Sequence, residues 1–528
     1  MSCNQPAITK KVQFGIKEQI DCETPATIST SDLVPVYTDA NISFDLQVND
    51  RTGLASSTLS NEADVMGRKL ASITAKAELI GLVDASTPPL ERQFYINSGM
   101  IETALKKVSI EASNVGQIPF GIEITNGVGE GILRAPVFDV DGVLYYEGAD
   151  FSDADSIKEK SGQVDATAIS KTIQRALISS ITGGSLREDE LLIGPNGQIR
   201  AMRCTKNGDS YLYFEIVTGT ASDGEKFTTR NKSLTLKSSS EDVQQIPVLK
   251  TSLVYRLRSG LIVTGSVSAS TGVMGVEYDG SEAFAYVVGS TGFSATDVLN
   301  TDQATWTATA DSKAGGFGYS PISSNQKIAT AHINTDGVKR TIWNSMSSFT
   351  IDAEANNIAF INLTTTGPIL EDETGDAPLL PEVDNDLEPV SFQSADMSFF
   401  DNEGSFSPVL KSVSMDMANS VITRDDANSN TGIAGTLITS RNPSGSMSVE
   451  QVPEAQWDYL GRYFSGRLAG SQWKFSNSCG NVVWVVAPQT QYSNVSQADT
   501  DGVLNNEISY GMKKGKLGDD ELYISYLA

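Results

Sequence analysis

The segment RKLASITAKAEL (residues 68–79) alternates apolar and polar side chains along its second half. The apolar residues at positions 73, 75, 77 and 79 fall on one face, and Lys76 and Glu78 fall on the other. This period of two predicts a strand with one buried face. The segment SRNPSGSMSVEQ (residues 440–451) has the same character, because an Arg and small residues again lead into an alternating run. The chain is therefore predicted to contain this strand twice.

Further elements recur in the same order. The tetrapeptide TDGV at 335–338 returns at 500–503, and each copy is followed by turn residues and a final β-type run. These runs are IAFINL (358–363) and ELYISYL (521–527). Repeated elements in a fixed order usually mean repeated supersecondary units. The sequence therefore predicts a duplicated module.

Helix signals are few. Apolar residues at 101, 105 and 108 form one stripe in the segment 98–112, and those at 457, 460 and 464 form another in 453–466. Each stripe predicts one core-facing helix per module. A third helix is predicted at 165–181, where an acidic residue precedes a stripe at 169, 173, 176 and 177. Short alternating runs elsewhere include ISFDLQV (42–48) and predict strands.

The composition places the chain in a class. It has 528 residues, of which 39% are hydrophobic and 45 are Gly, and its formal net charge is −26. Such a composition fits a globular, turn-rich β protein. Its acidity argues against binding to DNA phosphates or anionic lipid. No apolar run approaches 18 residues, and the N-terminus lacks an apolar signal core, so neither a membrane span nor standard secretion is expected.

Catalytic chemistry finds little support. His332 is the single histidine, so a Ser-His-Asp or Cys-His triad would need that residue and multi-His metal sites are excluded. The four cysteines (Cys3, Cys22, Cys204, Cys479) form no CxxC pair and are predicted to be buried free thiols of a reducing cytoplasm. The glycines at 127–132 lack the Lys of a phosphate loop, and DVDG at 139–142 is interpreted as a hairpin turn. We therefore assign no catalytic, cofactor or metal residue and expect a non-enzyme, although a pair of carboxylates for glycoside cleavage stays open.

Two segments interrupt the repeat. Residues 121–315 carry hairpin signals at 194–198 and 206–210 among strand-like runs, which predicts an inserted β-rich decorating region. Residues 368–390 are rich in Pro and acidic residues, and no Lys or Arg occurs from 342 to 410, so they are predicted to be a linker that is either a tether or an arm toward a neighbouring subunit. The predicted domains are module 1 at 1–120 and 316–367, the insert at 121–315, the linker at 368–390, and module 2 at 391–528.

The sequence on either side of the insert resembles a known family. The runs STSDLVPVY (29–37), ISFDLQV and GRKLASI resemble the opening of tail tube proteins of long, non-contractile-tailed bacteriophages, and SVSMDMANSVITRDD (412–426), VVWVVAP (482–488) and GDDELYISYL (518–527) resemble their C-terminal part. The resemblance implies a mainly β fold and rings that stack into a hollow tube, each ring lined by a closed β-barrel through which genomic DNA passes without specific binding. The large insert departs from the family.

The resemblance also implies an assembly and a place. Single-module members form hexameric rings, so a subunit with two modules is expected to form a similar ring from three chains, with a hexamer as the alternative. The expected partners are further copies of the chain and the tape measure, terminator and distal tail proteins. The expected location is the virion tail, after assembly in the host bacterial cytoplasm.

Two other classes remain open from the residues. A different virion component, such as a capsid or baseplate protein, would share the acidity and would form closed shells in place of stacked rings. A carbohydrate-binding or carbohydrate-cleaving β protein is suggested by the acidic residues and five tryptophans. Trp457 on its helix stripe and Trp484 within VVWVV are, however, expected to be buried and so not displayed to a sugar.

Overall fold

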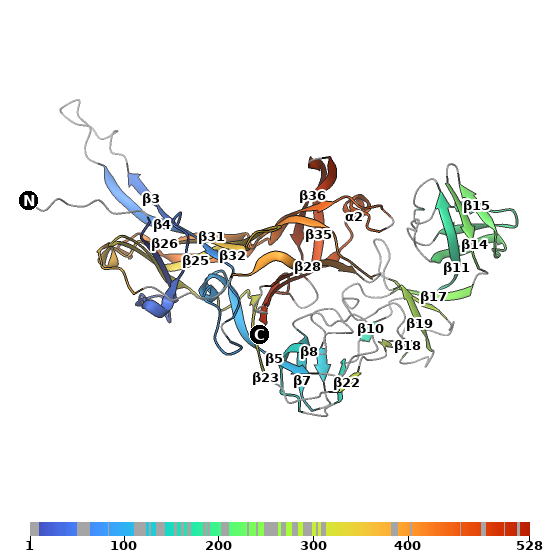
Figure 1. The fold of residues 1–528 in the computed structure, drawn as a ribbon, viewed down its shortest axis with the longest axis horizontal. Coiled ribbons are helices and arrows are strands. Elements are labelled where there is room, and N and C mark those ends of the chain that lie inside the picture. Colours follow the sequence, from blue (N-terminus) through green and yellow to red (C-terminus); the bar gives the residue numbers. More distant parts are fainter. Residues whose placement is uncertain are drawn as a thin grey trace, which may run out of the picture.

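The protein is almost entirely β-structured (Figure 1). The computed structural model describes residues 10–49, 64–82, 84–109, 123–125, 128–133, 143–152, 156–159, 163–165, 171–182, 186, 191–201, 211–229, 232–238, 241–247, 262–265, 271–276, 284–288, 298–301, 305–307, 313–381, 389–401, 404–454, 456–476, 482–500, 502–514 and 518–527. Within these residues there are two α-helices, α1 (Arg92–Asn97) and α2 (Tyr459–Ser465). The predicted mainly β class, with one short helix in each half, is confirmed.

The strands fall into three groups along the chain. The first repeat, as we name it, has β1 (Val12–Glu18), β2 (Leu33–Val34), β3 (Asn41–Asn49), β4 (Val65–Glu78), β24 (Ala329–Thr335), β25 (Val338–Glu354), β26 (Phe360–Pro368) and β27 (Gly375–Asp376). The second repeat has β28 (Ser391–Asp401), β29 (Gly404–Phe406), β30 (Leu410–Asp416), β31 (Asn419–Asp425), β32 (Ile433–Arg441), β33 (Ser444–Glu450), β34 (Ala469–Ser476), β35 (Val482–Thr500), β36 (Val503–Met512) and β37 (Tyr523–Leu527). The inserted region has β5 (Met100–Ser109), β6 (Glu123–Thr125), β7 (Glu130–Leu133), β8 (Val143–Gly148), β9 (Ser156–Glu159), β10 (Gln163–Asp165), β11 (Lys171–Thr182), β12 (Leu191–Ile193), β13 (Gly197–Ala201), β14 (Tyr211–Gly219), β15 (Lys226–Thr229), β16 (Lys232–Leu236), β17 (Glu241–Pro247), β18 (Ile262–Gly265), β19 (Thr271–Val276), β20 (Phe284–Val288), β21 (Val298–Thr301), β22 (Thr305–Thr307) and β23 (Lys313–Pro321).

One continuous antiparallel sheet joins the two repeats. Its strand order is β3-β4-β26-β25-β30-β33-β36-β35, with four strands from each repeat. The repeats meet where the C-terminal end of β25 pairs with β30. We call this pairing the internal junction. It makes the two halves of the chain a single structural unit.

A second layer of strands uses the N-terminal halves of the two longest strands. In the first repeat, β25 pairs there with β24 and β27, and β24 pairs with β1. In the second repeat, β35 pairs there with β34 and β37, and β34 pairs with β28. The helices α1 and α2 follow β4 and β33. The apolar faces of these elements share one hydrophobic core.

The two repeats share a β-bulge at the same place in their long strands, β25 and β35. Ser345 lies opposite Ala329 and its hydroxyl donates to the Ala329 carbonyl at 2.8 Å, while Thr490 lies opposite Ala469 and donates to the Ala469 carbonyl at 2.7 Å. Directly beyond each of these pairs the ladder register shifts by one residue. The duplication predicted from sequence is therefore present in the topology. Its matched strands are β1 with β28, β3 with β30, β4 with β33, β24 with β34, β25 with β35, β26 with β36, and β27 with β37.

The TDGV match, in contrast, joins turns that are not equivalent. The first TDGV connects β24 to β25, whereas the second connects β35 to β36, which matches the turn between β25 and β26. Asp336 and Gly337 have φ of 47° and 94°, and Gly502 has φ of 86°. Two-residue hairpin turns favour Asp-Gly because their backbone needs positive φ, so the motif recurs through turn chemistry. The alignment of IAFINL with ELYISYL was wrong for the same reason, since β26 matches β36. The alignment of residues 68–79 with 440–451 agrees with the ladders, in which β4 and β33 hold the same place.

Two of the three predicted helices are strands. Residues 98–112 contain β5, and the helix of that repeat, α1, ends just before it. Residues 165–181 contain most of β11. Both segments include β-branched residues, and each is paired along both sides, β5 by β23 and β8 and β11 by β14, β16 and β17. Long-range pairing thus overrides a helical stripe. The helix predicted within 453–466 is confirmed by α2, which Asp458 caps by accepting from the Gly461 amide at 2.7 Å. Its predicted core-facing stripe was wrong, because Trp457 precedes the helix, Phe464 is 79% exposed, and the buried residues of α2 are Tyr459 and Arg462.

The inserted region has two parts. β5 and β23 form a ladder at its base, β23 also pairs with β37 of the second repeat, and β6 to β9 with β22 continue from β5. The other strands form a separate sheet, in which β11, β14, β13, β12, β15 and β16 close into a six-stranded barrel with its own core. β11, β14 and β15 are labelled in Figure 1. The predicted hairpin at 194–198 is confirmed by the pairing of β12 with β13. The predicted turns at 139–142 and 206–210 lie outside the described residues.

Candidate assembly interface

The eight-stranded sheet ends in two exposed strand edges. Within the described residues β3 pairs with β4 alone, and residues 491–500 of β35 pair with β36 alone. All of β3 except Ile42 is exposed, and in β35 Ser493, Asn494, Ser496, Gln497 and Asp499 are exposed. An unpaired edge presents a row of N–H and C=O groups that can template pairing with another chain. We call these the β3 edge and the β35 edge.

The internal junction shows what such edges look like when they are paired. There Thr350 lies opposite Asp416, and the Ser414 hydroxyl donates to the Asp352 carboxylate at 2.6 Å across the two strands. The apolar side chains on this seam are at most 5% exposed; they are Phe349, Ile351, Val413 and Met415. The matched positions on the free edges hold Val495, Gln497, Ala40 and Ile42, of which Val495, Ala40 and Ile42 are only partly buried. Each free edge therefore resembles one side of the internal junction, without the strand that pairs with it there.

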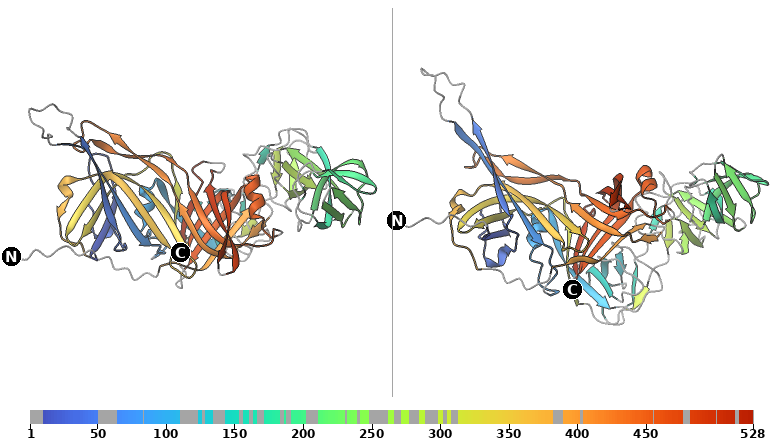
Figure 2. Two further views of the ribbon diagram at one scale, coloured as in Figure 1. Left: turned by 90° about the horizontal axis from the view of Figure 1, so that it is seen from above. Right: turned by 45° about the horizontal axis from the view of Figure 1, so that its top comes forward.

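The hairpin of β3 and β4 also presents apolar side chains to solvent. We define the arm as residues 44–49 and 65–71 of this hairpin, which projects away from the rest of the first repeat in Figures 1 and 2. Along one strand Phe44, Leu46 and Val48 are 49%, 45% and 49% exposed, and Met66 on the other strand is 60% exposed. A stripe of this kind marks a contact surface more often than a free one.

One face of the matching hairpin of the second repeat is covered, while Ile422 and Leu437 on it are 44% and 41% exposed. β31 and β32 fold back over the first repeat, where the Thr436 hydroxyl donates to the carbonyls of Asn344 at 2.9 Å and Thr366 at 3.2 Å. Asn344 in turn donates to the Ala434 carbonyl at 3.1 Å. Ile433 is 1% exposed on this hairpin. The two repeats thus differ in that the second hairpin folds back over the first repeat, whereas the outer part of the arm, with Phe44, Leu46 and Met66, stays exposed.

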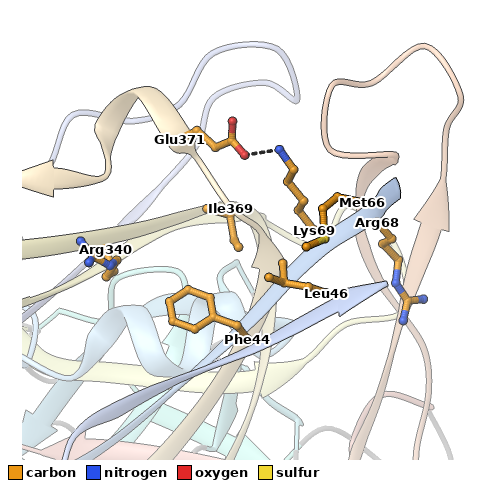
Figure 3. Close-up of a pocket in the computed structure, with 8 residues that line it drawn as sticks. All are labelled: Phe44, Leu46, Met66, Arg68, Lys69, Arg340, Ile369 and Glu371. Atoms are coloured by element: carbon orange, nitrogen blue, oxygen red, sulfur yellow. Dashed lines mark hydrogen bonds and ion pairs between the residues drawn. The ribbon is translucent and has the colours of Figure 1, made fainter. Parts of the chain in front are cut away.

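A shallow cavity of about 410 Å³ lies at the foot of the arm. Figure 3 shows its apolar floor and its charged rim. Its lining residues are Phe44, Leu46, Met66, Arg68, Lys69, Arg340, Ile369 and Glu371. Lys69 forms an ion pair with Glu371, and Arg68 pairs with Asp45 at 2.8 Å. The cavity is continuous with the exposed stripe of the arm, because Phe44, Leu46 and Met66 belong to both.

The described part of the acidic segment packs on its own chain. Glu373 pairs with Lys339 at 2.6 Å, the Thr341 hydroxyl donates to the Glu373 carbonyl at 2.9 Å, and β27 pairs with β25. Sequence reasoning missed the cations that pair with this segment because Lys339 is 34 residues from Glu373 and Lys69 is 302 residues from Glu371. The carboxylates Glu382, Asp384, Asp386 and Glu388 lie outside the described residues.

Glu91 and His332 are buried titratable groups. Glu91 accepts hydrogen bonds from the Ile80 amide at 3.1 Å and the Tyr526 hydroxyl at 2.7 Å, and the Tyr526 and Tyr95 hydroxyls are 2.7 Å apart. Burial raises the pKa of Glu91 to about 7. His332 lies in β24, and burial, followed by the charge of Lys339, lowers its pKa to about 4. Both groups are buried, and neither lines the cavity at the arm.

The sequence-level assignments of other residues have mixed outcomes. Trp457 and Trp484 are 6% and 7% exposed, which confirms that they are buried. Cys22 is a free thiol, but it is exposed and not buried as predicted, because it lies in the turn after β1. Cys3, Cys204 and Cys479 lie outside the described residues, as do the turn at 139–142 and part of 127–132.

The described residues carry neither a metal-binding cluster nor a membrane-spanning helix. Over the described part of the chain, no group of three or more His, Cys, Asp or Glu residues is placed to hold a metal ion. In the same residues no helix is long and apolar enough to cross a membrane. Comparison with known proteins finds no matching family model and no similar curated protein. The two sheet edges and the arm are therefore the features from which a function is proposed.

Proposed function

We propose that this chain is a structural virion protein that polymerises into stacked rings and forms the tail tube of a long-tailed bacteriophage. The observation that carries the proposal is the sheet itself. Two similar repeats are joined edge to edge inside one chain, and the same kinds of edge are left exposed at both ends. Because the two free edges differ from each other, copies would join head to tail, and such contacts generate closed rings or helical filaments.

The ring number follows from the repeat. If every repeat occupies the same place in the ring, three chains supply six repeats and 24 strands of the shared sheet, eight from each chain. Closing the sheet removes both exposed edges. A trimeric ring with pseudo-sixfold symmetry is therefore the favoured assembly, and a ring of six chains is the alternative.

The charge of the chain is compatible with a conduit. A net charge of −26 disfavours adhesion of DNA phosphates, so double-stranded DNA could pass without specific binding. The proposed location is the virion tail after assembly in the host cytoplasm, with tape measure, terminator and distal tail proteins as further partners.

Electron microscopy of the purified protein tests this proposal. Negative-stain images should show rings or tubes with an open lumen, and light scattering of isolated rings should give three times the chain mass. A chain that remains monomeric at high concentration, even with tail-initiating proteins present, would refute the function. Closed shells would favour a capsid role. Six chains per ring would leave the proposed function intact but would overturn the ring number inferred from the repeat.

A further inference from the structure

The internal junction offers a residue-level template for the contact between copies. It pairs the C-terminal end of β25 with β30. By the correspondence of the repeats, β25 matches β35 and β30 matches β3. The same junction between two chains would therefore pair the β35 edge of one copy with the β3 edge of the next.

The matching positions can be followed across the ladders. Thr350 lies opposite Asn362, and Asn362 lies opposite Lys76 of β4. Position 76 matches 448 of β33, because residues 68–79 and 440–451 hold the same place in the two sheets. Ser448 lies opposite Glu507, and Glu507 lies opposite Ser496. Thr350 therefore matches Ser496.

The partner strand is placed in the same way. Asp416 lies opposite Ser444 of β33, and Ser444 matches Ser72 of β4. Ser72 lies opposite Ser43. Asp416 therefore matches Ser43, and the observed pair Thr350 with Asp416 becomes Ser496 with Ser43 in a neighbouring chain.

We propose that copies of this chain join through an antiparallel ladder in which Ser496, Gln497 and Ala498 of one copy lie opposite Ser43, Ile42 and Asn41 of the next. This inference rests on the proposed self-assembly and specifies its register. The ladder buries the partly exposed Ile42 and Val495 in the place where Met415 and Phe349 are buried at the internal junction. It also pairs the backbone groups of both exposed edges.

Paired cysteines test the register. In a background with all four native cysteines changed to Ser, the double variant Ser43→Cys/Ser496→Cys should form disulfides between chains after mild oxidation of assembled protein. Opposed residues bring their Cα atoms within the distance that a disulfide spans, about 4.4–6.8 Å. Non-reducing gels should show covalent species of two and three chains. The neighbouring pair Ile42→Cys/Gln497→Cys should behave in the same way. The control Ser43→Cys/Ala498→Cys is displaced by two residues and should link at least tenfold less.

The outcomes distinguish failure of the proposed register from failure of the proposed tube function. Cross-linking of the displaced control in preference to the matched pairs, or of none of the pairs in assembled tubes, would overturn the register and leave the tube function standing. Efficient linking by Ser43→Cys alone would show two β3 edges meeting, which overturns the head-to-tail contact. A cysteine-free parent that stays monomeric would overturn both the register and the function. Mixing the single variants Ser43→Cys and Ser496→Cys should give linked dimers only after mixing.

Discussion

At the scale of single residues, Glu91 lowers stability at neutral pH. Its pKa is raised to about 7 by burial, whereas in the unfolded chain it stays near 4.5. The folded state therefore holds the proton more tightly, and stability is lost as pH rises from about 4.5 to about 7. We expect Glu91→Gln, which keeps an acceptor for the Ile80 amide and the Tyr526 hydroxyl, to stabilise the chain by about 1–2 kcal/mol at pH 8 and to have little effect at pH 4.5.

Thermal unfolding of the unassembled chain at several pH values measures this effect. Glu102 is the control, because it pairs with Arg92 at 2.6 Å and accepts from Tyr319 at 2.8 Å. Glu102→Gln removes an ion pair and should lower stability at neutral pH. A stabilisation by Glu91→Gln that is equal at pH 4.5 and pH 8 would contradict the proposed titration.

The acidic carboxylates that are visible have weak individual roles. Glu371 and Glu373 pair with Lys69 and Lys339, and their side chains are 60% and 52% exposed. Exposed pairs contribute about 0.2–1 kcal/mol each. The double change Glu371→Gln/Glu373→Gln should therefore lower the free energy of unfolding by at most about 2 kcal/mol and leave tube formation unchanged in low and high salt. Loss of tubes with normal unfolding would instead show that these residues contact a neighbouring chain.

At the scale of elements, the arm should be needed for assembly. One face of its counterpart, β31 with β32, is covered by the first repeat of the same chain, so a second copy is the expected cover for Phe44 and Leu46. Burying each such side chain contributes about 1.5–3 kcal/mol. The variant Phe44→Ser/Leu46→Ser should raise the concentration needed for tube formation at least about tenfold, with little change in the unfolding temperature of the monomer.

A matched control lies on the same strand. Asp45 sits between the two apolar residues and pairs with Arg68 at an exposed site, so Asp45→Asn should assemble almost normally. Sedimentation of tubes against protein concentration gives the comparison. Equal assembly of the serine variant and the parent would show that the arm stays uncovered.

Sequence patterns predicted elements well where local chemistry determines them. The alternation in 68–79 and 440–451 identified β4 and β33, and the turn residues at 194–198 identified the hairpin of β12 and β13. The helical stripes at 98–112 and 165–181 misled, because β5 and β11 are fixed by strands up to about 200 residues away along the chain, a separation that local propensity does not register. The assembly surface was beyond sequence reasoning for the same reason. A strand lies at an exposed edge when no strand pairs with one of its two sides, and this depends on residues distant in the sequence.

At the scale of the whole molecule, the insert interrupts the first repeat without interrupting its sheet. β4, β25 and β26 pair as their counterparts do in the second repeat, although more than 200 residues separate α1 from β24. The base of the insert is different, because β23 pairs with both β5 and β37 and Tyr319 packs on Tyr95 and Tyr526. The inserted region therefore has an outer part and a base, and the base, formed by β5 and β23, packs into the core shared by the two repeats.

Two deletions separate these parts. Replacing residues 121–315 with a short Gly/Ser linker keeps β5 and residues 316–321 of β23, including the residues that pair with β37. This variant should unfold near the parent's temperature and form tubes, because the eight-stranded sheet and both edges remain. Replacing 100–321 also removes the base and Tyr319, which should cost at least about 3 kcal/mol through lost aromatic packing. Thermal unfolding and negative-stain images give both readouts. If the shorter deletion folds but forms no tubes, the insert takes part in contacts between chains, and its predicted decorating role would be wrong.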